Sequence, residues 1–101
     1  MVVQYQGQKD GISTTFTLRI IGNNLSKSSS NYQIDLLQGD NPLPIFTSLI
    51  HQSLSNCLKE IYLFRKYNHI KFDADSEKVA PKLVPYDLVL YNYNKHALFA
   101  A

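Results

Sequence analysis

The segment Asn41–Leu58 constrains the fold most, because it is the only stretch of the chain with the clear spacing of an amphipathic helix. Asp40 or Asn41 can serve as the N-cap, and Pro42 suits the first helical position because a backbone N–H has no helical partner there. Apolar side chains then recur at intervals of three and four residues: Phe46, Leu49, Ile50, Leu54, Cys57 and Leu58. We therefore predict a helix over about 42–58 whose apolar face packs on a sheet.

The segment Ile12–Ile21 has the alternation that is typical of a half-buried antiparallel strand. Its even-numbered residues are mostly apolar and its odd-numbered residues are mostly polar. The polar stretch Gly22–Asn31 that follows is predicted to be a mobile surface loop. Further segments with strand-like composition are Val2–Gln6, Tyr32–Leu37, 61–67, Leu88–Tyr93, a short edge strand at Ile70–Phe72 and a return strand at Ala97–Ala101.

Residues 61–67 allow two interpretations. Their aromatic and β-branched composition favours a strand, and a continuation of the helix to Tyr67 is the alternative. If residues 61–67 form a strand, the order of elements predicts one α+β domain over residues 1–101. We expect an antiparallel sheet of about five strands with one main helix packed on one face.

The composition is typical of a globular protein, with 45% apolar and 18% charged residues. The net charge of +2 provides little electrostatic attraction for nucleic acid or for a membrane surface. The chain begins without a signal sequence and has no apolar run of about 20 residues, the length that crosses a membrane. We therefore expect a protein of the cytoplasm, with the nucleus as the alternative, and no membrane partner.

Candidate sites for metal binding or catalysis fail on residue type or on spacing. The acidic run Asp73–Glu77 opens like a calcium loop, but Lys78 stands where the loop needs glycine and Val84 where it needs glutamate. Cys57 falls on the apolar helix face, where a small core residue is expected, and the three histidines have no metal-ligand spacing. Asp35 could complete a triad with Cys57 and a histidine, but triads are identified by geometry. We expect no cofactor, no metal and no enzymatic activity.

The stretch Tyr62–Lys71 combines aromatic with basic side chains. On an open sheet, aromatic rings can stack on bases while Arg and Lys neutralise phosphates. The residues that would do this are Arg65, Lys66, Tyr67 and Lys71. The alternative is that alternate residues belong to the core and the basic side chains mark an exposed strand edge.

The chain ends in tyrosines followed by Leu98 and Phe99, although chain ends are usually polar. Such an apolar end must dock either on its own core or on a partner, and tyrosine is common at protein interfaces. Together with the predicted strand 61–67, it gives seven candidate partner-binding residues: Tyr62, Phe64, Tyr67, Tyr91, Tyr93, Leu98 and Phe99.

The stretch Leu36–Leu43, with the sequence LLQGDNPL, leads into Phe46 and the predicted helix and resembles the small proteasome-assembling chaperones. In that family a strand ends in a Leu-Leu-Gly-acid-Pro-Leu type of turn and enters a helix that packs on an antiparallel sheet. The resemblance implies a non-catalytic subunit of a heterodimer that helps to order the ring of the proteasome core particle. The chain departs from the family in the inserted Gln38 and in a Pro-rich segment that ends at Tyr93, so no functional residue is transferred.

The sequence therefore favours a non-enzymatic protein-interaction module, as a small subunit or assembly factor of a hetero-oligomeric complex. A small sheet-based nucleic-acid-binding protein is the alternative. A steep dependence of binding on salt would distinguish the second from the first.

Overall fold

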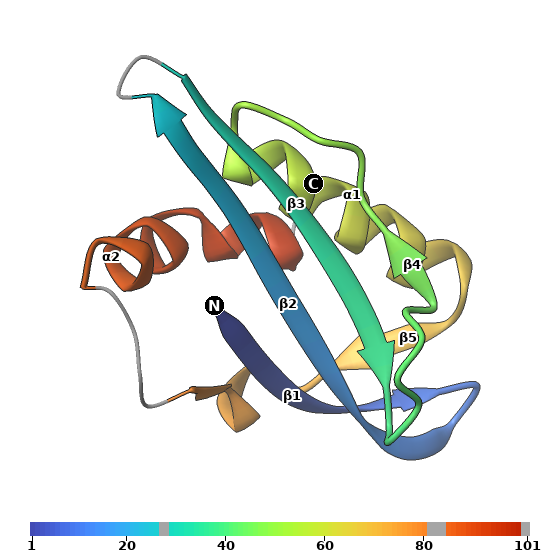
Figure 1. The fold of residues 1–101 in the computed structure, drawn as a ribbon. Helices are drawn as coiled ribbons and strands as arrows, with labels where there is room; N and C mark the ends of the chain where they lie inside the picture. Colours follow the sequence, from blue (N-terminus) through green and yellow to red (C-terminus); the bar gives the residue numbers. More distant parts are fainter. Residues whose placement is uncertain (27–28, 81–84, 100–101) are drawn as a thin grey trace.

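The computed structural model describes residues 1–26, 29–80 and 85–99 and has an α+β fold (Figure 1). The strands are β1 (Val2–Lys9), β2 (Ile12–Ser26), β3 (Ser29–Gln38), β4 (Phe46–Thr47), β5 (Ile70–Phe72) and β6 (Lys78–Val79). The helices are α1 (Leu54–Tyr67) and α2 (Pro85–Asn94), and there are 3₁₀ turns at η1 (Ala74–Ser76) and η2 (Lys95–Leu98). The predicted fold class, an antiparallel sheet with a helix packed against it, is confirmed.

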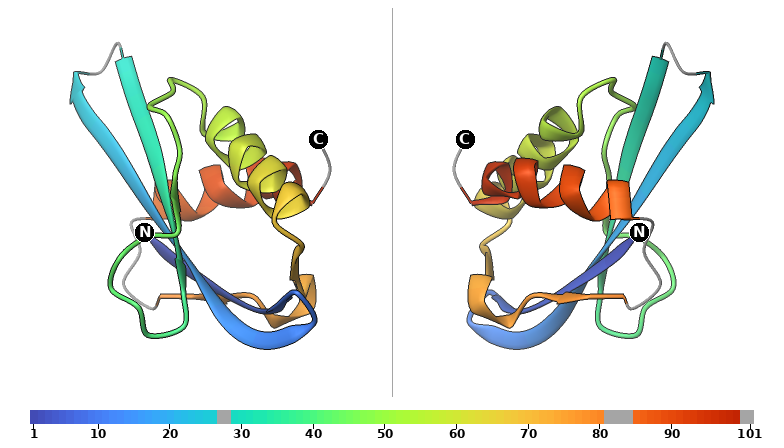
Figure 2. Two further views of the ribbon diagram at one scale, coloured as in Figure 1. Left: turned by 90° about the vertical axis from the view of Figure 1, so that its right-hand side faces the viewer. Right: turned by 90° about the vertical axis from the view of Figure 1, so that its left-hand side faces the viewer.

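The strands form one antiparallel sheet in the order β4–β3–β2–β1–β5, and β6 pairs with β1 on the same edge as β5. The sheet bends so that both helices lie on its concave side (Figure 2). In the long β2–β3 hairpin, Leu18 pairs with Leu36 and Ile20 pairs with Ile34. Because side chains alternate along a strand, this register points matching apolar residues of both strands toward α1.

The core lies between the concave face of the sheet and the two helices. The sheet contributes Val3, Tyr5, Phe16, Leu18, Ile20, Tyr32, Ile34, Leu36 and Ile70, and the helical segments contribute Leu54, Cys57, Leu58, Ile61, Tyr91, Ala97 and Leu98. The predicted apolar face of β2 is confirmed from Phe16 onward, and so is Cys57 as a core residue; on β3, Tyr32, Ile34 and Leu36 are buried as well. Ile12, at the start of β2, lies beyond the core and is exposed.

The helix predicted over about 42–58 is misplaced, because α1 overlaps only the end of that range. Residues 45–51 instead run along the outer edge of β3, where Ser48 N donates a hydrogen bond to Ile34 O at 2.9 Å. The backbone groups on this edge of β3 need partners, and pairing with residues 45–51 provides them before the chain turns into the helix.

Residues of the predicted helix over about 42–58, and of its predicted N-cap, lie in other environments. Leu49 and Ile50, predicted to belong to its apolar face, are exposed. The Asn41 side chain, a predicted N-cap, accepts a hydrogen bond from Leu43 N at 3.0 Å and so closes a turn. This local Asx turn competes with helix capping for the same side-chain oxygen.

Two predicted strands are also helical. Residues 61–67 form the second half of α1, which was the alternative interpretation, and Leu88–Tyr93 lies in α2. The described part of the predicted return strand Ala97–Ala101 lies in η2 or directly after it, and its last two residues are outside the described ranges. Leu58 and Ile61 are both fully buried, and only a helix places residues three apart on one face.

The predicted loop Gly22–Asn31 is mostly strand. β2 continues to Ser26 and β3 begins at Ser29, and these two residues pair with each other; the two residues between them lie outside the described ranges. The end of the hairpin projects past the rest of the sheet (Figure 1). A polar composition is therefore compatible with strand structure here.

We expect Gly7→Ala to lower the free energy of unfolding by about 1–3 kcal/mol, because it overpacks a site with no free space. An added Cβ would lie 2.1 Å from Lys71 O on the neighbouring strand β5 and 3.1 Å from the Phe16 ring. The control is Gly22→Ala, whose Cβ would meet the Tyr32 ring at an ordinary 3.4 Å. Urea unfolding measures both variants. Equal stability of the two would show that β5 moves aside freely.

Candidate functional site

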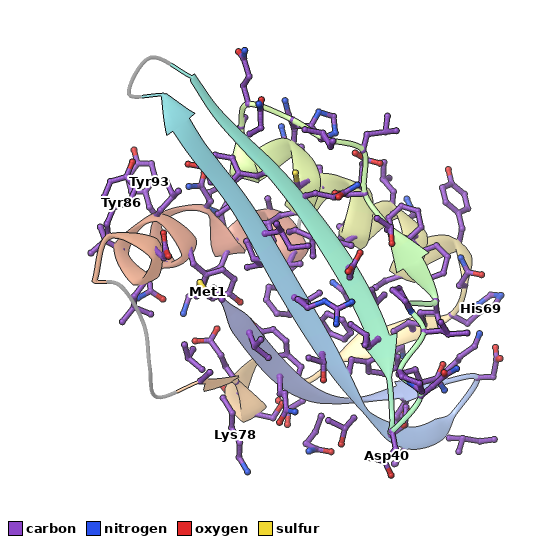
Figure 3. The ribbon with its side chains drawn as sticks, in the orientation of Figure 1. Met1, Asp40, His69, Lys78, Tyr86 and Tyr93 are labelled. Atoms are coloured by element: carbon purple, nitrogen blue, oxygen red, sulfur yellow. The ribbon has the colours of Figure 1, made fainter. Side chains whose placement is uncertain are left out.

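The outer face of α2, formed by Tyr86, Val89 and Tyr93, is an apolar and aromatic surface. These side chains are 60%, 68% and 80% exposed. Their spacing of three and four residues places them along one side of the helix, and Figure 3 shows Tyr86 and Tyr93 close together at the same edge of α2. The only charged residue between Pro85 and Asn94 is Asp87, so this face carries almost no charge.

The inner side of α2 is fixed by a buried hydrogen-bond network. Tyr91 is fully buried, and its hydroxyl is hydrogen-bonded to the hydroxyl of Tyr5 on β1. The Tyr5 hydroxyl donates to Glu77 Oε2 at 2.7 Å, and Lys95 Nζ lies 3.5 Å from the same oxygen. The network joins β1, the segment before β6, α2 and η2, so it holds α2 in one position against the sheet.

Both tyrosine hydroxyls in this network remain protonated at neutral pH. Burial is the main cause that raises the pKa of Tyr5 and of Tyr91, and the neighbouring Glu77 carboxylate adds to the effect in each case. A neutral hydroxyl can donate to the carboxylate, whereas a tyrosinate would repel it. The network therefore has the properties of a structural anchor.

The seven candidate partner-binding residues separate by burial. Tyr67 and Tyr93 are exposed; Tyr62, Phe64 and Phe99 are partly buried; Tyr91 and Leu98 are buried. Phe64 stacks on Phe46 with ring centroids 4.6 Å apart. Leu98 is fully buried and Phe99 packs against the core, so the apolar end of the described chain docks on its own core.

Sequence reasoning missed Tyr86 and Val89. The signal for them was present, because Pro85 suits a first helical position and the spacing 86, 89, 93 is helical. The strand prediction for Leu88–Tyr93 hid this pattern, since a strand would have placed Val89 and Tyr93 on the same face as Tyr91.

A second feature is a basic pocket of about 410 Å³ at the junction of α1, β5 and the β1–β2 turn. It is lined by Gln8, Asp10, Gly11, Tyr62, Arg65, Lys66, His69, Ile70 and Lys71. Three of the four residues predicted for nucleic-acid binding, Arg65, Lys66 and Lys71, therefore come together. The fourth, Tyr67, does not line the pocket, and the residues lie at the end of a helix and on an edge strand, not across an open sheet face.

The residues considered for a catalytic triad have separate partners. The Cys57 thiol donates to Tyr32 O at 3.2 Å, and burial raises its pKa, so it is held as a protonated thiol. His51 pairs with Glu60, and Asp35 accepts from Arg19 at 2.8 Å. Within residues 1–26, 29–80 and 85–99, no three His, Cys, Asp or Glu side chains converge as metal ligands would.

Comparison with known proteins gives no match to a family model, a curated protein or a solved structure. The resemblance to the proteasome-assembling chaperones therefore stays a prediction. In the part of the chain that the structure describes, no helix has the length and hydropathy that crossing a membrane requires.

Proposed function

We propose that this protein is a non-enzymatic protein-binding module that binds a different protein through the outer face of α2. In this proposal it acts in the cytoplasm or nucleus as a small subunit or assembly factor of a hetero-oligomeric complex. The observation that supports the proposal is the exposure of Tyr86, Val89 and Tyr93 along one side of a helix. Contiguous exposed apolar side chains are characteristic of interaction sites.

The chemistry of this face indicates the kind of partner. Side chains at positions i, i+3 and i+7 are the anchors that a helix places into an apolar groove. Tyrosine is enriched and charge is depleted at the centres of protein interfaces, and the outer face of α2 has both properties. We therefore expect the partner to offer an apolar groove with hydrogen-bond acceptors for the two tyrosine hydroxyls.

The buried network beneath α2 supports the same proposal. Because Tyr91, Tyr5 and Glu77 fix the helix in the free protein, binding would not have to order it. A surface that is ordered in advance binds more tightly than one that folds on contact, since less conformational entropy is lost.

We expect Val89→Asp to weaken partner binding about tenfold or more, because it buries an unpaired charge at the centre of the interface. Its free energy of unfolding should change by less than about 0.5 kcal/mol, because the side chain is mostly exposed. The partner is first identified by photo-crosslinking from position 89 in a native lysate, and its affinity for each variant is then measured by calorimetry. The matched control is Ile12→Asp, at a side chain that is 72% exposed at the start of β2.

Three results would contradict the proposal. Equal weakening by Val89→Asp and Ile12→Asp would place the contact elsewhere. A crosslink between two copies of this chain would indicate a homo-oligomer. Binding that survives Val89→Asp at full strength would show that the outer face of α2 is not used.

A further inference from the structure

The basic pocket is strongly asymmetric in charge. Its walls carry Arg65, Lys66 and Lys71 together with His69, and Asp10 is the only carboxylate among the described residues that line it. Asp10 Oδ2 lies 3.7 Å from Nζ of Lys9, which does not line the pocket, and this ion pair partly offsets the negative charge of Asp10. In the described part of the chain, neither Lys66 nor Lys71 forms an ion pair. The pocket therefore has an excess of positive charge.

Arg65 is the innermost of these cations and has no carboxylate partner among the described residues. It is only 7% exposed. Its guanidinium donates to the backbone oxygens of Leu98 and Ile70 and lies 4.3 Å from the centre of the Phe72 ring. Its Nε is buried and has no hydrogen-bond partner in the described residues. Carbonyl and aromatic groups are dipoles and quadrupoles without net charge, so the positive charge of Arg65 stays uncompensated in a medium of low dielectric constant.

The rim of the pocket is held in a defined backbone geometry. Asp10 and His69, at φ values of 51° and 55°, are non-glycine residues in the left-handed region, and Gly11 follows at 80°. Asp10 N donates to His69 O at 3.1 Å and thereby ties the two turns together. Left-handed non-glycine residues are unfavourable by roughly 1–2 kcal/mol each and tend to occur where a site is preorganised.

We propose that the basic pocket binds the phosphate group of a small phosphorylated molecule. A phosphate dianion matches several convergent cations better than a singly charged carboxylate does, and Arg and Lys are the side chains that usually bind it. The volume of about 410 Å³ lies in the range of small-molecule sites. The Gln8 amide and the Tyr62 ring, which also line the pocket, are available to the rest of the molecule.

The test is titration of the full chain with inorganic phosphate, followed by ¹H–¹⁵N NMR. We expect saturable shifts at the amides of Asp10, Gly11 and residues 69–71. The double variant Lys66→Gln/Lys71→Gln should weaken binding about tenfold, because each lysine loses a charge-assisted contact. The control double variant Lys59→Gln/Lys78→Gln makes the same change in net charge at exposed lysines outside this pocket, and its affinity should equal that of the unmodified chain.

Other outcomes would overturn the proposal. Equal weakening by both double variants, or shifts that never saturate, would mean non-specific attraction to surface charge. A second titration with a short oligothymidylate distinguishes the source of the phosphate. Tighter binding of the oligonucleotide, with a salt dependence that indicates several phosphate contacts, would identify a nucleic-acid site instead of a small-molecule site. Neither titration involves the outer face of α2, so these results leave the proposed function unaffected.

Discussion

Above about pH 10, the free energy of unfolding is expected to fall by about 1.4 kcal/mol per pH unit for each of the two buried tyrosines, Tyr5 and Tyr91. In the unfolded chain a tyrosine releases its proton near pH 10. In the folded chain burial raises both pKa values, so the folded state keeps protons that the unfolded state has released. The stabilisation is complete below the unfolded pKa and is lost as the pH rises toward the folded pKa.

The measurement is urea unfolding at a series of pH values from about 8 to 12, with tyrosinate absorbance recorded in parallel. Tyr91→Phe should remove one titrating group and reduce the slope by about 1.4 kcal/mol per pH unit. At neutral pH it should cost about 1 kcal/mol, through the lost hydroxyl contact with Tyr5. Tyr93→Phe is the control, because the Tyr93 side chain is exposed and lies outside the buried network. An unchanged slope in Tyr91→Phe would mean that this hydroxyl already ionises in the folded protein.

The sheet was largely predictable from the sequence, because strand alternation is a local property. Phe16, Leu18 and Ile20 alternate with polar residues, and Tyr32, Ile34 and Leu36 share one side of the next strand. A single periodicity fits each segment, and the buried faces agree with it. Residues 38–41 form the turn after β3, where Asn41 N donates a hydrogen bond to Gln38 O.

The helices were predicted less well, because their apolar residues fit two periodicities. The segment 42–58 has helical spacing, but its first part pairs with the free edge of β3, a contact between residues distant in sequence. Residues 61–67 have strand-like composition, yet Ile61 is buried on the same helical face as Leu58. In both cases tertiary contacts outweigh local propensity.

The two candidate surfaces show the same limit. Arg65, Lys66 and Lys71 could be selected by residue type. The hydrogen bond that holds Asp10 beside His69, however, joins residues far apart in the sequence. The outer face of α2 required the helix itself to be predicted. Tyr91 was selected for a partner because it is aromatic, whereas its burial depends on Tyr5, which precedes it by 86 residues.

Replacing Arg65 with alanine is expected to lower the free energy of unfolding by about 3–5 kcal/mol. The change leaves a cavity between the aromatic rings of Phe72 and Phe99, whose centres lie 4.3 and 5.4 Å from the guanidinium carbon. It also removes the donors to Leu98 O and Ile70 O. Burial lowers the pKa of Arg65, which means that the charge is poorly solvated, and its removal recovers part of that penalty.

Arg65→Met separates these contributions, because methionine fills most of the volume but donates no hydrogen bonds. We expect Arg65→Met to cost about 1–2 kcal/mol in urea unfolding at neutral pH, the value of the lost contacts to the carbonyls. Hydrogen exchange should accelerate at the amide of Phe99, which donates to His96 O, since the guanidinium holds η2 against α1. A loss as large in Arg65→Met as in Arg65→Ala would mean that the hydrogen bonds, not the packing, fix η2. A gain in stability with Arg65→Met, together with loss of phosphate binding, would show that Arg65 contributes to phosphate binding and lowers the free energy of unfolding.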